Sequence, residues 1–301
     1  MWANMIQNKK EYLIFAFFCL GTLVLRLFYI TKGNGPFVYA DELGYWSHAA
    51  HMAGYTWAGV MDGVGWYGFG YSFLLLPALL LSSQMAAAYK IAVLLNVVMC
   101  LFVFGLACAV SRRLFPSQNA FLRGMLAFTA TSFTSYIFYS YITMCETLVT
   151  LLVWLILYEV ISLEEREAWW KGLLLGVTAG YAYMVHNRMI SVVAAVFLCV
   201  LLLFFMRRLH GKTAVLCLLA FAGMFVLNGF MKTYLVGMVE NNPVLETHGF
   251  AVKMGQANTG GVQMEKLLNL FTPNGLLQFF LNVMGQVWEC LCATYLLFGI
   301  G

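Results

Sequence analysis

Two neighbouring carboxylates, Asp41 and Glu42, stand near the start of a segment whose pattern predicts a helix, Tyr39-Ala-Asp-Glu-Leu-Gly-Tyr-Trp-Ser-His. A carboxylate placed there can take a proton from a hydroxyl group, which makes the pair a candidate for acid–base catalysis. The helix macrodipole explains the same pair equally simply, because it favours acidic residues in the first turn. On a helix Asp41, Tyr45 and His48 share one face, whereas Glu42 points about 100° away. The two carboxylates are therefore predicted to differ in role.

Glu146 and the turn His186-Asn187-Arg188 are the other polar groups that the pattern singles out. Glu146 opens an apolar run, so it is either a site residue or an ordinary acid at a helix start. Arg188 lies between two apolar runs, where its guanidinium offers a fixed fork of donors to a phosphate. His186 and Arg188 are therefore predicted to bind substrate, together with Glu146, Tyr45 and His48.

A metal site is the weaker interpretation of the histidines. His48 and His51 stand three residues apart and could hold a metal with Asp41, but spacing brings no cysteine or second carboxylate to complete the set. We therefore predict no metal ligands and no certain cofactor, with a divalent metal left as the alternative.

The chain that must position these groups has 301 residues, of which 62% are hydrophobic and 10% charged. A soluble domain carries about 45–50% apolar and about 25% charged residues, so this composition excludes one. Apolar runs near the 20 residues of a membrane-spanning helix recur along the chain, without the alternation of a membrane barrel. The sequence predicts an all-α, multi-pass membrane protein in contact with the lipid bilayer. The net charge of +4 is too small to predict a nucleic-acid partner.

The placement of basic residues favours one of two topologies, which differ in whether the short apolar run 68–82 spans the membrane. The apolar runs cover about 12–30, 68–82, 90–110, 124–142, 146–163, 170–185, 189–206, 213–231 and 275–300. If the short run 68–82 does not span, ten basic residues share the N-terminal side and six the other, as the positive-inside rule favours. The ten are Lys9, Lys10, Arg112, Arg113, Arg123, Arg166, Lys171, Arg207, Arg208 and Lys212, and the six are Lys32, Lys90, Arg188, Lys232, Lys253 and Lys266.

This topology predicts about eight transmembrane helices in one domain, 1–301, with juxtamembrane helices in the first outer loop. The outer loops cover about 31–84 and 232–274, and the candidate site lies on the outer face of a plasma or inner membrane. Arg26, near the outer end of the first run, is expected to extend its side chain outward to water. The chain stops at the end of an apolar run, which predicts that it is the N-terminal part of a longer protein.

The order of the motifs resembles a known family. Asp41-Glu42 is followed by an aromatic stretch and a short apolar helix, then by Tyr89-Lys-Ile-Ala-Val-Leu-Leu-Asn and Ser-Arg-Arg-Leu-Phe at 111–115. Cys-Glu-Thr-Leu at 145–148 and the segment from Gly172 to His-Asn-Arg at 186–188 come next. Over about residues 12–210 this order looks like the GT-C membrane glycosyltransferases, closest to the protein O-mannosyltransferase and aminoarabinose-transferase-like branch, glycosyltransferase family 39.

The resemblance implies an enzyme that uses a polyprenyl-phosphate-linked sugar as donor on the outer face. It implies that Asp41 is the catalytic base, that Glu42 helps to place substrate, that Glu146 lines the same cavity and that Arg188 lies near the donor phosphate. The acceptor would be an envelope glycan, a lipid or a protein. Many members carry a Lys-Pro-Pro-like or Arg-Pro-like step before the short helix, where this chain has Gly65-Trp-Tyr-Gly-Phe-Gly-Tyr-Ser.

Two other classes of function remain open on the residues. A transporter or flippase would use carboxylates inside the spans, and Glu159 and Glu289 lie at or near such positions, although no inverted repeat accompanies them. A non-catalytic subunit of an envelope-assembly complex is the third. Substitution of Asp41 separates them, because only an enzyme would lose turnover while the variant still folds.

Overall fold

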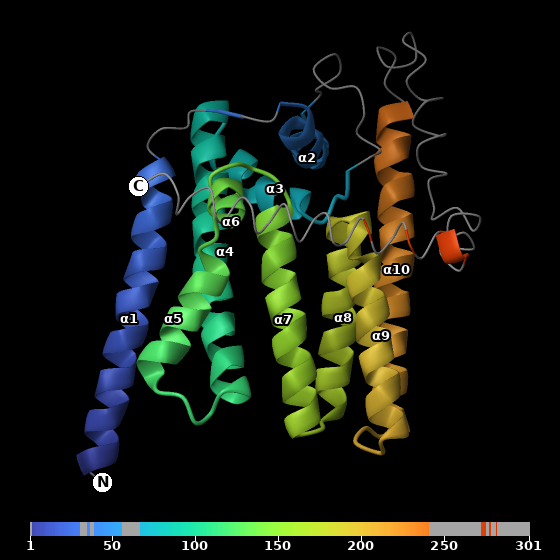
Figure 1. The fold of residues 1–301 in the computed structure, drawn as a ribbon. Coiled ribbons are helices and arrows are strands. Elements are labelled where there is room, and N and C mark those ends of the chain that lie inside the picture. The colour runs from blue at the N-terminus through green and yellow to red at the C-terminus, as the bar shows by residue number, and fades with distance from the viewer. Residues whose placement is uncertain are drawn as a thin grey trace.

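The computed structural model describes residues 2–30, 35, 36, 39–55, 67–240, 272–274, 277 and 281 (Figure 1). All regular elements in these ranges are helices. They are α1 (Trp2–Ile30), α2 (Tyr39–Met52), α3 (Ser72–Leu81), α4 (Met85–Leu114), α5 (Ala120–Thr131), α6 (Thr134–Ser140), α7 (Glu146–Glu165), α8 (Trp169–Val185), the 3-10 turn η2 (Asn187–Met189), α9 (Ile190–Phe205) and α10 (Gly211–Glu240). The prediction of an all-helical fold is therefore confirmed for the described ranges.

Five helices in the described ranges are long and apolar enough to cross a membrane. These segments are Lys9–Phe28, Met85–Leu114, Glu146–Glu165, Asn187–Phe205 and Gly211–Tyr234. Large apolar side chains such as Phe17, Phe102 and Phe205 are exposed on them, which suggests a lipid surround. The predicted last span, 275–300, and most of the second predicted loop lie outside the described residues.

The long helices run side by side, alternately up and down, and so divide the charged residues between two ends (Figure 1). One end holds the start of α1, α5, α8 and α10 and the last turns of α4, α7 and α9, and we call it the basic end. Its basic residues are Lys9, Lys10, Arg112, Arg113, Arg123, Arg166, Lys171, Arg207, Arg208 and Lys212. The opposite end carries α2 and α3, and we call it the α2 end.

The predicted span at 124–142 is two helices, because α5 ends at Thr131 and α6 begins at Thr134. Arg26 of α1 is fully buried at this break. Its guanidinium donates to the carbonyl of Thr131, at 2.6 Å, and so caps the end of α5. It also lies over the ring of Tyr136 in α6, 5.4 Å from the ring centroid. The expectation that Arg26 extends outward to water is therefore wrong.

Helices α8 and α10 are packed through glycines spaced four residues apart. Gly172, Gly176 and Gly180 share one face of α8, and a Cβ added at Gly176 would come within 2.2 Å of the carbonyl oxygen of Cys217 in α10. Small residues at this spacing let two helix backbones approach closely inside a membrane, where packing contributes more than exclusion of water.

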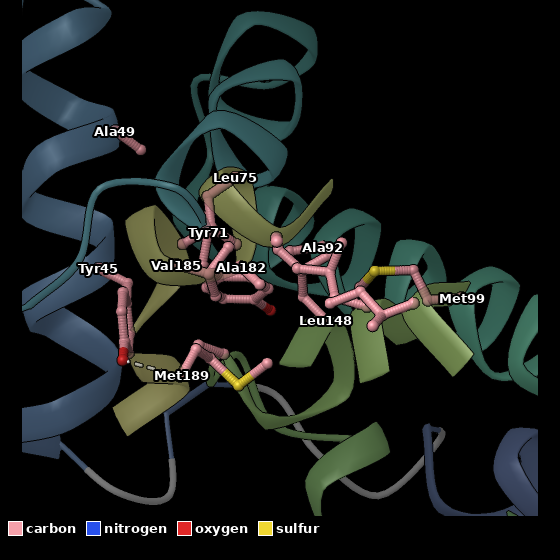
Figure 2. Packing of buried hydrophobic residues seen from close by; sticks show 14 of the residues in the cluster. Tyr45, Ala49, Tyr71, Leu75, Ala92, Met99, Leu148, Ala182, Val185 and Met189 are labelled. Atoms are coloured by element: carbon pink, nitrogen blue, oxygen red, sulfur yellow. Dashed lines mark hydrogen bonds between the residues drawn. The ribbon is translucent and has the colours of Figure 1, made fainter. Parts of the chain in front are cut away.

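The largest core cluster begins at the α2 end, extends to Leu163 and Leu209 at the basic end, and joins α2 and α3 to α4, α7, α8, α9 and α10. Tyr45 of α2 lies there with Tyr71, Leu148, Val185 and Met189 (Figure 2). The ring of Tyr45 meets the ring of Tyr71 edge-on, with centroids 5.4 Å apart. This packing fixes the position of α2, the helix that carries Asp41 and Glu42.

Two glycines allow the segment before α3 to pack closely against the end of α8. A Cβ at Gly68 would come within 2.2 Å of the carbonyl oxygen of Val185, and one at Gly70 within 2.8 Å of the same residue. The N–H of Gly70 donates to the carbonyl of Met184 at 3.2 Å. The glycines of the Gly-Phe-Gly sequence therefore hold the chain, and Tyr67 just before it, close to the turn that follows α8.

Candidate functional site

Asp41 lies in the first turn of α2 and is partly exposed. Its Oδ1 accepts a hydrogen bond of 2.8 Å from the hydroxyl of Tyr67. Burial, together with this bond to the carboxylate, raises the pKa of Tyr67 to about 12. The phenol therefore stays protonated at neutral pH and holds the carboxylate in one orientation.

Glu42, the next residue, lies in different surroundings and is fully buried. Its Oε2 accepts bonds from the Tyr89 hydroxyl at 2.8 Å and from the Thr143 amide and hydroxyl at 2.7 and 2.6 Å. A buried carboxylate is stable only with such donors, and these join α2 to α4 and to the turn before α7. The assignment of Glu42 to substrate placement stays a prediction, while its contacts make it an anchor of α2.

Tyr45 and His48, which share a predicted face with Asp41, are both almost fully buried. The hydroxyl of Tyr45 donates to the Sγ of Cys145 at 2.9 Å, and burial raises the pKa of this phenol well above its usual value. These side chains therefore support the site from the core. Among the described residues, no three His, Cys, Asp or Glu side chains lie close enough together to hold a metal ion.

Glu146 and Arg188, 42 residues apart in the sequence, come together at the same end of the bundle. The Nη2 of Arg188 donates to the Oε1 of Glu146 at 2.9 Å. Glu146 is 20% exposed and Arg188 is 68% exposed, so the carboxylate fixes one side of a guanidinium that otherwise faces outward. The remaining donors of the guanidinium are available to an anion.

A pocket of about 300 Å³ opens beside this ion pair. Its walls come from α6, from the first turn of α7 and from the turn between α8 and α9. The lining residues are Phe133, Ser135, Tyr136, Tyr139, Glu146, Val149, Thr150, His186, Arg188 and Met189. It therefore combines an aromatic wall with a cation, a carboxylate and a histidine.

His186 contributes a neutral ring to the pocket. Burial, and then the positive charge of Arg188, lower its pKa to about 4. Its Nδ1 accepts the backbone N–H of Arg188 at 3.0 Å, which leaves Nε2 to carry the proton as a donor. The ring thus begins the η2 turn and also offers one hydrogen-bond donor to a ligand.

Asp41 does not line the pocket itself, and Tyr67 connects the two. Tyr67 donates to Asp41 and directly precedes Gly68, which packs against the carbonyl of Val185, the residue before His186. The structure therefore brings Asp41 to the same end of the bundle as the pocket, beside the η2 turn.

The sequence did not pair Tyr67 with Asp41, and it did not single out Tyr139 or Thr143, although all three contact or face the predicted carboxylates. A signal for two of them was present, because Ser-Tyr-Ile-Phe-Tyr-Ser-Tyr-Ile-Thr at 135–143 carries hydroxyl groups through the end of an apolar run. Hydroxyls at membrane depth are costly unless they find partners, so such a segment marks a polar site.

No family model matches the chain, and no curated protein matches it significantly. The resemblance to the GT-C glycosyltransferases therefore stays a prediction that depends on the motifs and their order.

Proposed function

We propose that the chain is a membrane glycosyltransferase, which transfers a sugar from a polyprenyl-phosphate donor to a hydroxyl of an envelope glycan, a lipid or a protein. The observation that carries the proposal is the neighbourhood of Asp41 and Arg188. A partly exposed carboxylate and an outward-facing guanidinium lie at the same end of the bundle, and they are connected by Tyr67 and by the close packing of Gly68 on the end of α8. These are the two charges that the reaction requires.

In the proposed reaction Asp41 takes the proton of the acceptor hydroxyl while the acceptor oxygen attacks the anomeric carbon of the sugar. The bond from that carbon to the phosphate oxygen breaks, and its electron pair leaves with the polyprenyl phosphate. Arg188 compensates the charge of the phosphate, and Glu146 holds Arg188 in place. His186 donates from Nε2 to a phosphate or sugar oxygen, and Tyr139 provides an aromatic surface for the sugar.

The membrane setting of the proposal follows from the charge distribution. The basic end faces the cytoplasm by the positive-inside rule, so the α2 end, with residues 31–84 and 232–274, faces outward in an eight-span plasma or inner membrane protein. Cysteine labelling from outside tests this orientation. Ser83→Cys between α3 and α4 should react with a membrane-impermeant reagent, and Ser117→Cys between α4 and α5 should not.

The decisive experiment is transfer of labelled sugar from polyprenyl-phosphate donors by the purified protein. The donor to test is the one that accumulates, by mass spectrometry, in cells lacking the protein. Asp41→Asn keeps the shape of the side chain and removes the proton acceptor, so transfer should fall about 10²–10⁴-fold while the variant still folds. Glu164→Gln, at the basic end, is the matched control. Wild-type turnover by Asp41→Asn would remove the base from this residue.

One observation favours the alternative of a transporter. Glu159 lies in the second half of α7, is 5% exposed, and accepts a hydrogen bond of 3.0 Å from Thr178 in α8. Intramembrane carboxylates often carry protons or ions. A transporter would lose substrate flux in Glu159→Gln and keep it in Asp41→Asn, whereas the proposed transferase shows the reverse order of loss. A non-catalytic subunit would show neither activity.

A further inference from the structure

Three adjoining cavities open at the basic end, away from the candidate site. They measure about 340, 790 and 630 Å³, and Arg112 of α4 lines all of them. The first two lie between α1, α4 and α5 and share Glu11, Ile14 and Arg123 as well. We call this pair the basic groove, defined by Lys10, Glu11, Phe15, Cys108, Arg112 and Arg123.

The basic groove carries an excess of positive charge. Lys10, Arg112 and Arg123 line it against the single carboxylate Glu11, which leaves two more positive than negative formal charges. The ion pair between Arg123 and Glu11 is long, because its Nη2 and Oε1 atoms are 3.4 Å apart. In the described part of the chain Arg112 makes no ion pair, and its neighbour Arg113 is turned to Glu165 of α7, at 3.1 Å. Arg112 is thus a cation held in a concave site with its donors available.

One wall of the groove is apolar. Tyr12, Ile14 and Phe15 of α1 face Cys108 of α4 in the first cavity, and Phe15 is 41% exposed. The helix wall there belongs to Lys9–Phe28, one of the segments able to cross a membrane. Arg112 and Arg123 line the same cavity as this apolar wall. A ligand that fits must be anionic at one end and apolar at the other.

We propose that the basic groove binds a phospholipid with a net negative headgroup, taken from the leaflet at the basic end. The lipid phosphate lies against Arg112 and Lys10, because the guanidinium fork matches phosphate oxygens and the ammonium adds a second charge. An acyl chain lies along Phe15 and Cys108. The volume of the first cavity is in the range of pockets that hold small ligands. This inference does not depend on sugar transfer at the α2 end.

Lipid binding to the purified full-length chain tests the proposal. Native mass spectrometry in a neutral detergent counts lipid adducts during titration with phosphatidylglycerol or phosphatidylcholine. Wild-type protein should retain phosphatidylglycerol in preference. Arg112→Gln should weaken that binding about fivefold, and Lys10→Gln with Arg112→Gln about 25-fold, since a cation near an anionic lipid contributes about this factor. Arg112→Lys should keep most of the affinity. Lys212→Gln, an exposed cation at the same end but outside the groove, should behave as wild type.

A second arm separates a lipid from a free anion. Inorganic phosphate at millimolar concentration should not displace phosphatidylglycerol, because it lacks the acyl chain that the apolar wall binds. Displacement would overturn the proposal in favour of a soluble phosphate ligand. Equal retention of phosphatidylglycerol by wild type and by the Lys10→Gln, Arg112→Gln double variant would also overturn it, since binding would then be a property of the whole membrane surface.

Discussion

The guanidinium of Arg188 and the carboxylate of Glu146 meet at 2.9 Å, and this ion pair connects the beginning of α7 to the turn between α8 and α9. Both residues lie at the edge of the apolar bundle, where a cation fixed on one side by a carboxylate can still receive an anion on the other. Residues 42 positions apart thereby form one binding element.

Arg188 is expected to contact the donor phosphate. Arg188→Ala should reduce donor use about 10–100-fold, the range for a lost hydrogen bond to a charged group. Donor use by Arg188→Lys should lie between that of the wild type and that of Arg188→Ala, because lysine keeps the charge and loses the forked guanidinium donors. Steady-state transfer at varied donor concentration measures this, with Lys90→Ala, an exposed cation at the same end, as control. Unchanged donor KM and kcat in Arg188→Ala would show the assignment to be wrong.

Tyr67 is expected to act through Asp41. Tyr67→Phe removes the hydroxyl that donates to Oδ1, so kcat should fall about tenfold, as for the loss of one hydrogen bond, with donor KM little changed. If Tyr67 had only a structural role, Tyr67→Phe would instead lower thermal stability without lowering kcat at an unchanged donor KM. Tyr55→Phe, at the exposed end of α2, is the control. Equal kcat values for Tyr67→Phe and Tyr55→Phe would show that Tyr67 has no part in the reaction.

The packing of α8 on α10 predicts a large difference between two glycine substitutions. Gly176→Ala places a Cβ against the backbone of Cys217 and should destabilise the fold by about 1–3 kcal/mol. Gly223→Ala in α10 meets no atom within 4 Å and should be neutral or stabilise by up to about 1 kcal/mol. Thermal unfolding in the same detergent compares them. A smaller loss for Gly176→Ala than for Gly223→Ala would contradict the interface.

His186 should not control the acidic limb of the activity profile. Its pKa is lowered to about 4, so the ring is neutral in the folded protein above about pH 5. His186→Asn keeps an acceptor for the Arg188 N–H and removes the titration, and kcat/KM should fall with acid along the same curve as in wild type. Because the unfolded ring binds protons at higher pH than the folded ring, His186 destabilises the fold as pH falls from about 6.5 to 4. His186→Asn should therefore lose less thermal stability than wild type over that window.

The helical class of this protein could be predicted from the sequence because hydropathy reports directly on lipid contact. The break between α5 and α6 could not be predicted, because the two residues at the break, Ser132 and Phe133, are neither proline nor glycine. Arg26, which was predicted to reach water, instead donates to the carbonyl of Thr131 at this break. The glycine spacing of α8 indicates a close helix partner, but it does not say which helix that is.

The charged residues of the candidate site could be predicted from the sequence, but the residues that hold them in place could not. Asp41, Glu146 and Arg188 stood out because charges are rare in an apolar chain. Tyr67 could not be paired with Asp41 from the sequence, since their contact depends on how Gly68 and Gly70 fold the chain against α8. The different surroundings of Glu42 follow from its offset around the helix, while its partner Thr143 is 101 residues away.

The capping of α5 by Arg26 also sets an order on biosynthesis. An arginine at the centre of a lone transmembrane helix raises the free energy of membrane insertion by about 2.5–3.5 kcal/mol, and one near the end, like Arg26, raises it by less. The carbonyl that offsets this cost belongs to Thr131, which is synthesised 105 residues after Arg26. During translation Arg26 therefore has only the Thr22 carbonyl of its own helix until α5 has emerged, and its final position depends on the assembly of α1 with α5 rather than on the insertion of α1 alone.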